Sequence, residues 1–297
     1  MRRAFAEKVL EMAQNDDKLV VLIGDISHHL LRDFEKKFPD RFYNVGICEQ
    51  TIVGMAAGLA MQGFKPIVHT IAPFCVERAY EQIKVDLCYQ NLDVTIVSVG
   101  ASFDYAHLGC THHSYNDVSI LRSLPNMHVI APGTSEEFET LFEKNWSNGS
   151  PKYFKLTTDQ HSQNLLILDQ VNIVKHTGKS QKTAFVSGHL LDVVLENKEK
   201  FESIVYIPEL SCLKKRNIEK IASILSCSES VLTVEENCVI GGLGDLVFDI
   251  ASKTGLNVKI HKIGVKNQFL EEYGKREQHR EDLGLTTEGI SAKIESM

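Results

Sequence analysis

The stretch Leu19-Val20-Val21-Leu22-Ile23-Gly24-Asp25 is the strongest indication of how this chain folds. Five consecutive apolar residues that end at a Gly-Asp pair are typical of a strand buried on both faces of a parallel sheet. Such a strand needs helices on both sides of its sheet. The residues before it, 4–14, have a helical pattern and supply the first of them.

The same alternation of short β-rich runs and helical patterns continues for about 130 residues. Further strands are predicted over 42–45, 66–71, 94–99, 127–130 and 152–156, and helices over 49–62, 76–90, 116–124 and 135–146. This order predicts βαβ units and a parallel sheet.

A second α/β pattern follows a polar stretch that has no clear periodicity. We expect domains at 1–165 and 181–297, joined by a linker at 166–180. In the second domain, strands are predicted over 183–187, 203–207, 230–234 and 258–263, and helices over 188–199, 215–225, 241–253 and 287–295. The expected fold class is α/β, with two doubly wound domains: a mostly parallel sheet first and a smaller, mixed sheet second.

Composition narrows the range of functions. The 297 residues carry 39 acids and 32 bases, a net charge of −7, which disfavours nucleic acid as the main partner. No run of 18 apolar residues is present, and Met1-Arg2-Arg3-Ala4 does not resemble a signal peptide. Seven cysteines without CxxC spacing indicate reduced, mostly buried thiols in a cytoplasmic protein.

Ligands of parallel α/β sheets bind where strands end at their carboxyl side. The candidate segments are therefore 24–29, 46–50, 70–74 and the long loop 100–116. Within the second segment, Glu49 opens a predicted helix. It is either a common first-turn acid that favours the helix dipole, or a carboxyl in an apolar setting that serves as a general acid or base. The residues alone favour the first interpretation.

The loop 100–116 contains His107, Cys110, His112 and His113. Their spacing matches no standard zinc motif. Neutral histidines are better suited to proton transfer or to polar contacts with a substrate.

Two segments rich in small residues have two interpretations each. Gly54, Ala57, Gly58 and Met61 share one helix face and either pack within the domain or contact another subunit. The segment Gly241-Gly242-Leu243-Gly244 either cradles an anion or forms a tight turn, and the lack of a dinucleotide fingerprint favours the turn.

Taken together, eight segments resemble transketolase and 1-deoxyxylulose-5-phosphate synthase. They occur in the family's order and span nearly the whole chain: 40–50, 56–60, 63–68, 78–83, 109–113, 121–127, 232–237 and 241–244. The resemblance implies an enzyme that uses thiamin diphosphate, with a pyrimidine-binding domain followed by the family's C-terminal domain.

Seven residues take roles from this resemblance. Glu49 falls on the glutamate that activates the cofactor through N1′ of its aminopyrimidine ring, which reverses the interpretation above. Phe74 and Ile71 match residues that pack on this ring, although core packing also explains them. Asp25 and Ile26 match the bend between the two cofactor rings. His112 matches a histidine that contacts substrate oxygens, and His113 is a neighbouring candidate.

The diphosphate-binding half of the family is missing from the sequence. Its Gly-Asp-Gly motif does not occur, because Gly24-Asp25-Ile26 and Gly244-Asp245-Leu246 both lack the third glycine. The resemblance then implies one subunit of a split enzyme. An N-terminal subunit would supply the diphosphate site and the Mg²⁺ ligands, in an α2β2 assembly, so that this chain holds no metal and is inactive alone. The expected reaction moves a two-carbon unit from a ketose or 2-oxo acid to a sugar acceptor.

On the substrate side the sequence departs from the family. Leu108 replaces an acid, and the two family arginines that bind phosphate fall near Ala101 and Thr157-Thr158. An unusual or nucleotide-linked sugar, or phosphate contacts from the partner, would explain the loss. Two alternatives remain: the β subunit of a 2-oxo-acid dehydrogenase first component, and a scaffolding subunit. Gly109 to His113 and Gly63 to Pro66 disfavour the first, and Glu49 with Phe74 disfavours the second.

Overall fold

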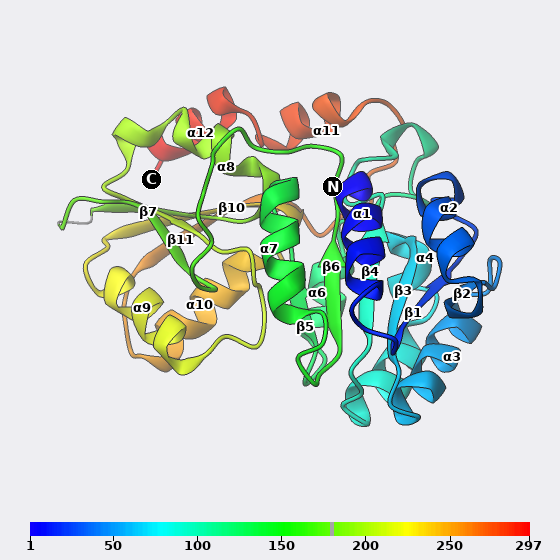
Figure 1. The fold of residues 1–297 in the computed structure, drawn as a ribbon. Coiled ribbons are helices and arrows are strands. Elements are labelled where there is room, and N and C mark those ends of the chain that lie inside the picture. The colour runs from blue at the N-terminus through cyan, green and yellow to red at the C-terminus, as the bar shows by residue number, and fades with distance from the viewer. Residues whose placement is uncertain (179–180) are drawn as a thin grey trace.

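Two β-sheets lie side by side in the computed structural model, which describes residues 1–178 and 181–297 (Figure 1). The first sheet is entirely parallel, with strand order β2-β1-β3-β4-β6-β5. Its strands are β1 (Leu19–Ile23), β2 (Phe42–Asn44), β3 (Lys65–Ile71), β4 (Thr95–Val99), β5 (His128–Ile130) and β6 (Lys152–Lys155). The prediction of a parallel first sheet is confirmed.

Strand β1 is fully buried because helices cover both faces of the sheet. Val21 packs in a core cluster with residues of α1 and α7, whereas Val20 and Leu22 pack in a second cluster with residues of α3. This alternation explains why the strand is apolar throughout. The helices around this sheet are α1 (Arg2–Ala13), α2 (His28–Lys37), α3 (Glu49–Met61), α4 (Ala72–Val76), α5 (Tyr80–Gln82), α6 (Asp117–Arg122) and α7 (Ser135–Asn145).

The helix predicted over 76–90 is divided and starts earlier. Helix α4 follows β3 directly, with Pro73 in its first turn, where proline is tolerated because the missing N–H has no helical partner. The chain leaves the helix after Val76 and resumes with α5 and a π-helical segment, Ile83–Tyr89. Phe74 therefore lies on a short helix, and Arg78 lies at the break.

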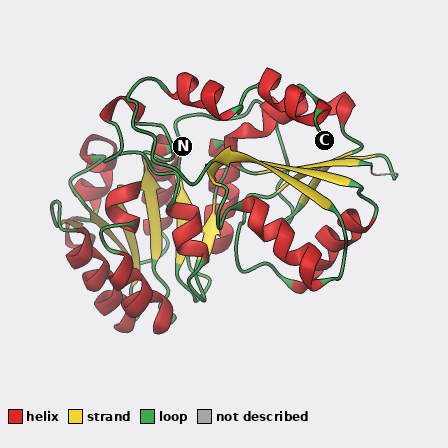
Figure 2. Cartoon of the chain, turned by 180° about the vertical axis from the view of Figure 1, so that it is seen from behind, coloured by secondary structure: helices red, strands yellow, loops and turns green. Residues whose placement is uncertain are grey.

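The second sheet is mixed, as predicted, with strand order β11-β10-β8-β9-β7. Among the described strands of this sheet, β7 alone runs antiparallel to its neighbour. The elements are β7 (Asn172–His176), β8 (Lys182–Val186), α8 (Leu191–Leu195), β9 (Ser203–Tyr206), α9 (Lys215–Ser226), β10 (Ser230–Cys238), α10 (Leu243–Lys253), β11 (Lys259–Val265), α11 (Arg276–Leu283) and α12 (Thr287–Glu295). Figure 2 shows this sheet from behind, beside the first.

Two segments of this half differ from the secondary structure expected of them. Strand β7 lies inside 166–180, which the sequence predicts as linker and of which 179–180 lie outside the described residues. Helix α11 has no predicted counterpart, because only one of its eight residues, His279, is buried and gives no apolar period. The domain boundaries themselves stay a prediction.

All seven cysteines are free, but the prediction that most are buried is wrong. Cys75, Cys88 and Cys238 are buried, and the other four are exposed. Cys48 has small and apolar neighbours in sequence, yet it occupies the exposed N-cap position of α3. Among residues 1–178 and 181–297, no helix is long and apolar enough to cross a membrane.

The glycine-rich start of α10 is occupied by a carboxylate of the chain itself. The backbone N–H groups of Leu243 and Gly244 donate to the two Glu235 oxygens at 2.7 and 2.9 Å. A side chain at Gly242 would collide with this carboxylate. The turn therefore serves an internal acid, and burial raises the pKa of Glu235 to about 7.

This raised pKa predicts a pH dependence of stability. The folded state binds the Glu235 proton more tightly than the unfolded chain, so the free energy of unfolding should fall as pH rises from about 4.5 to about 7 and then level off. At ~1.4 kcal/mol per pKa unit the loss is about 3 kcal/mol. Urea unfolding of Glu235→Gln should lack this component, so its stability relative to wild type should rise by that amount across the range.

The matched control is Glu229→Gln, which changes an exposed acid just before β10. Its difference from wild type should be constant with pH. A constant difference for Glu235→Gln as well would contradict the assignment.

Candidate functional site

The carboxyl edge of the first sheet brings the predicted segments together. Because all six strands are parallel, the loops after β1, β2, β3 and β4 leave from the same edge. Glu49 begins α3 after β2, and Phe74 lies in α4 after β3. The loop that carries His112 follows β4.

Glu49 is buried with one carboxylate oxygen paired and the other free. Its side chain is 1% exposed, and Arg78 Nη1 donates to Oε2 at 2.8 Å. Oε1 is also buried, and no hydrogen-bond partner for it is found among the described residues. A buried, unpartnered carboxylate oxygen is costly unless a ligand or a proton satisfies it.

The apolar setting expected for Glu49, with Val45, Ile47, Val53 and Met55 around it, is present in part: Val53 is buried and Val45 packs against the same core cluster. Ile47 and Met55 point outward, at 65% and 38% exposure. Burial and the charge of Glu49 raise the pKa of the Cys75 thiol, on α4, to about 12. Arg78 was not predicted as a site residue. The sequence signal for it is that Arg78 begins 78–83, one of the eight segments that carry the family resemblance.

Arg78 also connects Glu49 to Phe74 and His112. Its guanidinium lies over the Phe74 ring at 4.4 Å, and the His112 ring meets Phe74 edge-on with centroids 5.1 Å apart. We call Glu49, Phe74, Arg78 and His112 the Glu49 cluster. Three of its four members, Glu49, Phe74 and His112, are predicted from sequence, and Arg78 links Glu49 to the Phe74–His112 pair.

His112 is half-buried and oriented by its own loop. Its Nδ1 lies 2.9 Å from the Thr111 hydroxyl, and Tyr105 approaches the ring edge-on. Burial, with the nearby His107, lowers the pKa of His112. Its imidazole is therefore suited to neutral hydrogen bonding.

Ile71 and Tyr105 both lie close to Gly100, just after the end of β4. Gly100 has a φ of +77°, and a Cβ there would lie 2.4 Å from the Tyr105 ring and 3.3 Å from Ile71. Only glycine lets these two side chains approach over the end of β4. On its other contact, the Tyr105 ring meets His112 edge-on.

Asp25 belongs to a second polar group, at the ends of β1 and β2. Its N–H donates to Asn44 Oδ1 at 3.1 Å, and Asn44 Nδ2 donates back to Asp25 Oδ1 at 3.2 Å. These bonds, with a contact to His28, lower the pKa of the exposed Asp25 carboxyl. Asn44, which was not predicted, also accepts from the Gly46 N–H in the loop that leads to Glu49. Ile26 is half-buried against the core.

His113 lies on the other side of its loop from the Glu49 cluster. It is 4% exposed, and its ring meets Phe103 at 5.6 Å and His279 of α11 at 5.2 Å. Burial lowers its pKa. A substrate contact for His113 stays a prediction. Within the described ranges no group of three or more His, Cys, Asp or Glu side chains is arranged to hold a metal ion.

Residues 1–160 match the family described as transketolase, pyrimidine binding domain. The chain belongs to the transketolase family. It is 28% identical to one subunit of the apulose-4-phosphate transketolase of Actinobacillus succinogenes, over 96% of this chain and 94% of that protein. It is 30% identical to the 1-deoxy-D-xylulose-5-phosphate synthase of Clostridium perfringens (strain SM101 / Type A), over 96% of this chain but only 47% of that protein.

A solved structure extends the similarity to the whole fold. The split gene transketolase described as an inactive beta4 tetramer superposes with a TM-score of 0.86 and 28% identity, covering 99% of this chain and 97% of that one. Within the transketolase family, this chain therefore corresponds in full to a protein from a split gene.

The Glu49–Arg78 contact predicts a coupling between the two side chains. Arg78→Gln should lower the free energy of unfolding by about 1–3 kcal/mol, because it leaves a buried carboxyl without its donor. In Glu49→Gln the same Arg78 change should cost less. The measurement is a double-mutant cycle by urea unfolding, and additive effects of the two changes would contradict the pairing.

Proposed function

We propose that this chain is the pyrimidine-binding subunit of a split, thiamin-diphosphate-dependent transketolase-like enzyme. The reaction transfers a two-carbon unit from a ketose or 2-oxo acid to a sugar acceptor. The observation that carries the proposal is Glu49 Oε1, which is buried without a partner among the described residues, while Oε2 is held by the Arg78 that lies over Phe74. Membership of the family supports it, as does a relative of similar length that is named as one subunit of a transketolase.

The Glu49 cluster fits the aminopyrimidine half of thiamin diphosphate. A ring nitrogen would give Oε1 the partner that it lacks. Phe74 and Ile71 would flank the ring, as the family resemblance implies. When bound, thiamin diphosphate supplies the reactive carbon and the electron sink that two-carbon transfer requires. Glu49 holds a proton at Oε1 toward the ring nitrogen, while Arg78 fixes Oε2. His112, neutral and oriented by Thr111, holds a substrate oxygen.

The other half of the site belongs to a partner subunit in this proposal. The sequence lacks a Gly-Asp-Gly motif. Helix α3 supports a subunit contact: a Cβ at Gly54 or Gly58 would meet nothing within 4 Å, and Met55 and Met61 are exposed. The N-terminal, diphosphate-binding subunit would supply the Mg²⁺ ligands, in a cytoplasmic α2β2 assembly that is active only when complete.

The acceptor in this proposal is an unusual or nucleotide-linked sugar. Cations near the predicted phosphate position are already engaged. Lys155 is buried and donates to Asp117 at 2.8 Å and to Asn237 at 2.6 Å. Arg276 reaches the Thr158 hydroxyl but contacts Asp104 and Asp159 as well. Neither is free to form the charged clamp that a phosphate needs.

A Glu49→Gln substitution tests the cofactor role. The enzyme should be assembled with the chain that co-purifies with this one and carries a Gly-Asp-Gly motif. Turnover and hydrogen–deuterium exchange at the cofactor's reactive carbon should fall about 10²–10⁴-fold, because a proton-transfer group is lost. Glu81→Gln changes an exposed acid on α5 and should leave both rates unchanged. Survival of exchange and turnover in Glu49→Gln would refute the mechanism.

A second assay tests the acceptor. The same assembled enzyme should turn over xylulose 5-phosphate and ribose 5-phosphate slowly, because the chain lacks free arginines at the two positions considered. The measurement is kcat/KM for this pair, compared with candidate acceptors that carry a nucleotide. Rapid turnover of the two pentose phosphates would exclude the unusual acceptor while leaving the thiamin-dependent reaction intact.

A further inference from the structure

The loop that carries His112 is enclosed between the Glu49 cluster and the C-terminal part of the chain. Residues 102–113, here called the His112 loop, contact Phe74 through His112 and contact α11 on the other side. We propose that α11 and the residue Tyr273 before it form a positioning element for His112. This inference rests on the proposed function only for the role of His112.

Tyr273 closes the turn from which His112 projects. The His112 and His113 N–H groups both donate to the Gly109 carbonyl, at 2.9 and 3.1 Å. Gly109 has a φ of +73°, and a Cβ there would lie 2.6 Å from Tyr273 Cε1. The Tyr273 ring thus rests on the residue that organises the turn, and only glycine leaves room for it.

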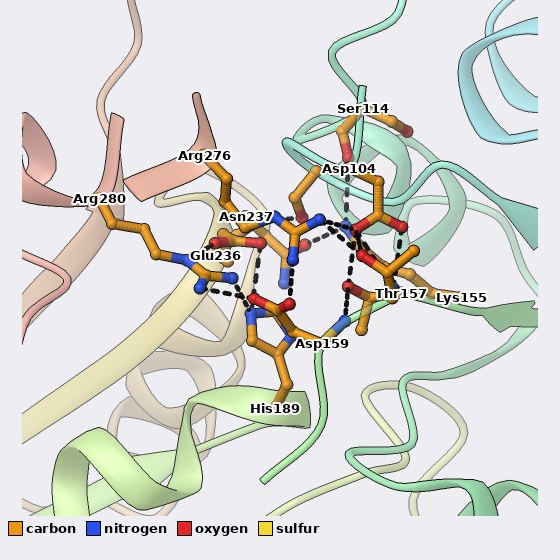
Figure 3. A network of polar contacts seen from close by, with 12 residues as sticks. Asp104, Ser114, Lys155, Thr157, Asp159, His189, Glu236, Asn237, Arg276 and Arg280 are labelled. Atoms are coloured by element: carbon orange, nitrogen blue, oxygen red, sulfur yellow. Dashed lines mark hydrogen bonds and ion pairs between the residues drawn. The ribbon is translucent and has the colours of Figure 1, made fainter. Parts of the chain in front are cut away.

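Arg276 holds the beginning of the same loop. Its Nη2 donates to Asp104 Oδ1 at 2.8 Å, and Asp104 is buried. Asp104 also accepts from the Thr157 hydroxyl and the Thr158 N–H, both at 3.0 Å. Figure 3 shows Arg276 extending from its helix to Asp104, with Arg280 beside it on Glu236. The salt bridge therefore ties the loop to α11 and to the residues that follow β6.

His279 completes the contact one turn further along α11. Its ring stacks on Phe103 with centroids 4.9 Å apart and planes 20° apart, and it meets His113 edge-on. Arg276 and His279 are three residues apart and share one helix face. None of these contacts involves Glu49 or Phe74. Loss of the element should therefore affect the substrate side and spare activation of the cofactor.

The test is hydrogen exchange of the backbone in Tyr273→Ala. Tyr273 is 68% exposed, so the variant should fold. Amides of residues 106–113 should exchange about tenfold faster, the factor that a contact of about 1.4 kcal/mol represents, while those of β4 stay unchanged. Tyr273→Phe keeps the ring and should restore slow exchange. Phe269→Ala removes another exposed ring, 76% exposed and four residues earlier, and should have no effect.

A second pair of variants, at Arg276 and Asp104, tests whether α11 itself positions the loop or whether Tyr273 acts alone. Arg276→Gln should also speed exchange in 106–113, and adding Asp104→Asn should restore part of the protection by replacing the buried ion pair with amides. In the assembled enzyme, kcat/KM should fall about tenfold in Tyr273→Ala, whereas exchange at the cofactor's reactive carbon without substrate should match wild type.

The outcomes separate the two proposals. Unchanged amide exchange in both Tyr273→Ala and Arg276→Gln would overturn the positioning element. Faster amide exchange with unaltered kcat/KM would show that the element does not position His112 for the substrate. A wild-type assembly that transfers no two-carbon unit would overturn the proposed function, and the amide exchange would still decide the positioning.

Discussion

The parallel arrangement around β1 is the constraint on which the rest of the structure depends. A strand that is apolar at every position must be covered on both faces, and its neighbours then connect through helices. All the strands consequently point the same way, and every loop that follows a strand emerges at one edge. Glu49, Phe74 and His112 each lie in a segment that follows one of these strands, although the first and the last are 63 positions apart. The parallel topology of the sheet therefore brings these three residues to the same edge, whatever their side chains are.

Two buried glutamates show what distinguishes a site from a structural feature. Glu235 lies deep in the C-terminal half, and its two oxygens each accept a backbone N–H at the start of α10. Glu49 is equally buried, but one of its oxygens has a donor and the other has none among the described residues. The first carboxyl completes the fold. The Glu49 carboxyl has one oxygen without a hydrogen-bond donor from the fold, and a bound group can supply that donor.

The features that the sequence predicts best are those with a local signal. The apolar run of β1 and the start of α3 at Glu49 follow from patterns a few residues long. Strand β7, which makes the second sheet mixed, lies instead in the predicted linker. Features that depend on contacts between residues far apart in the sequence have no such local signal. The Arg78–Glu49 pair joins residues 29 positions apart, and Arg78 lies just after the early end of α4. Helix α11 is polar on most of its surface, so the sequence shows no helical period of apolar residues there. Its proposed role depends on the His112 loop that it contacts. The roles of the seven site residues remain predictions.

The buried charges between the two sheets restrict how this protein can vary. Lys155 on β6 is paired with Asp117 and also donates to Asn237 on β10. Asp104 and Arg276 come from opposite halves of the chain and neutralise each other away from water. A change at one of these positions leaves an unpaired charge in the interior unless its partner changes too. Descendants of this sequence should therefore exchange such residues in pairs, and the two halves should evolve as one unit despite their separate sheets.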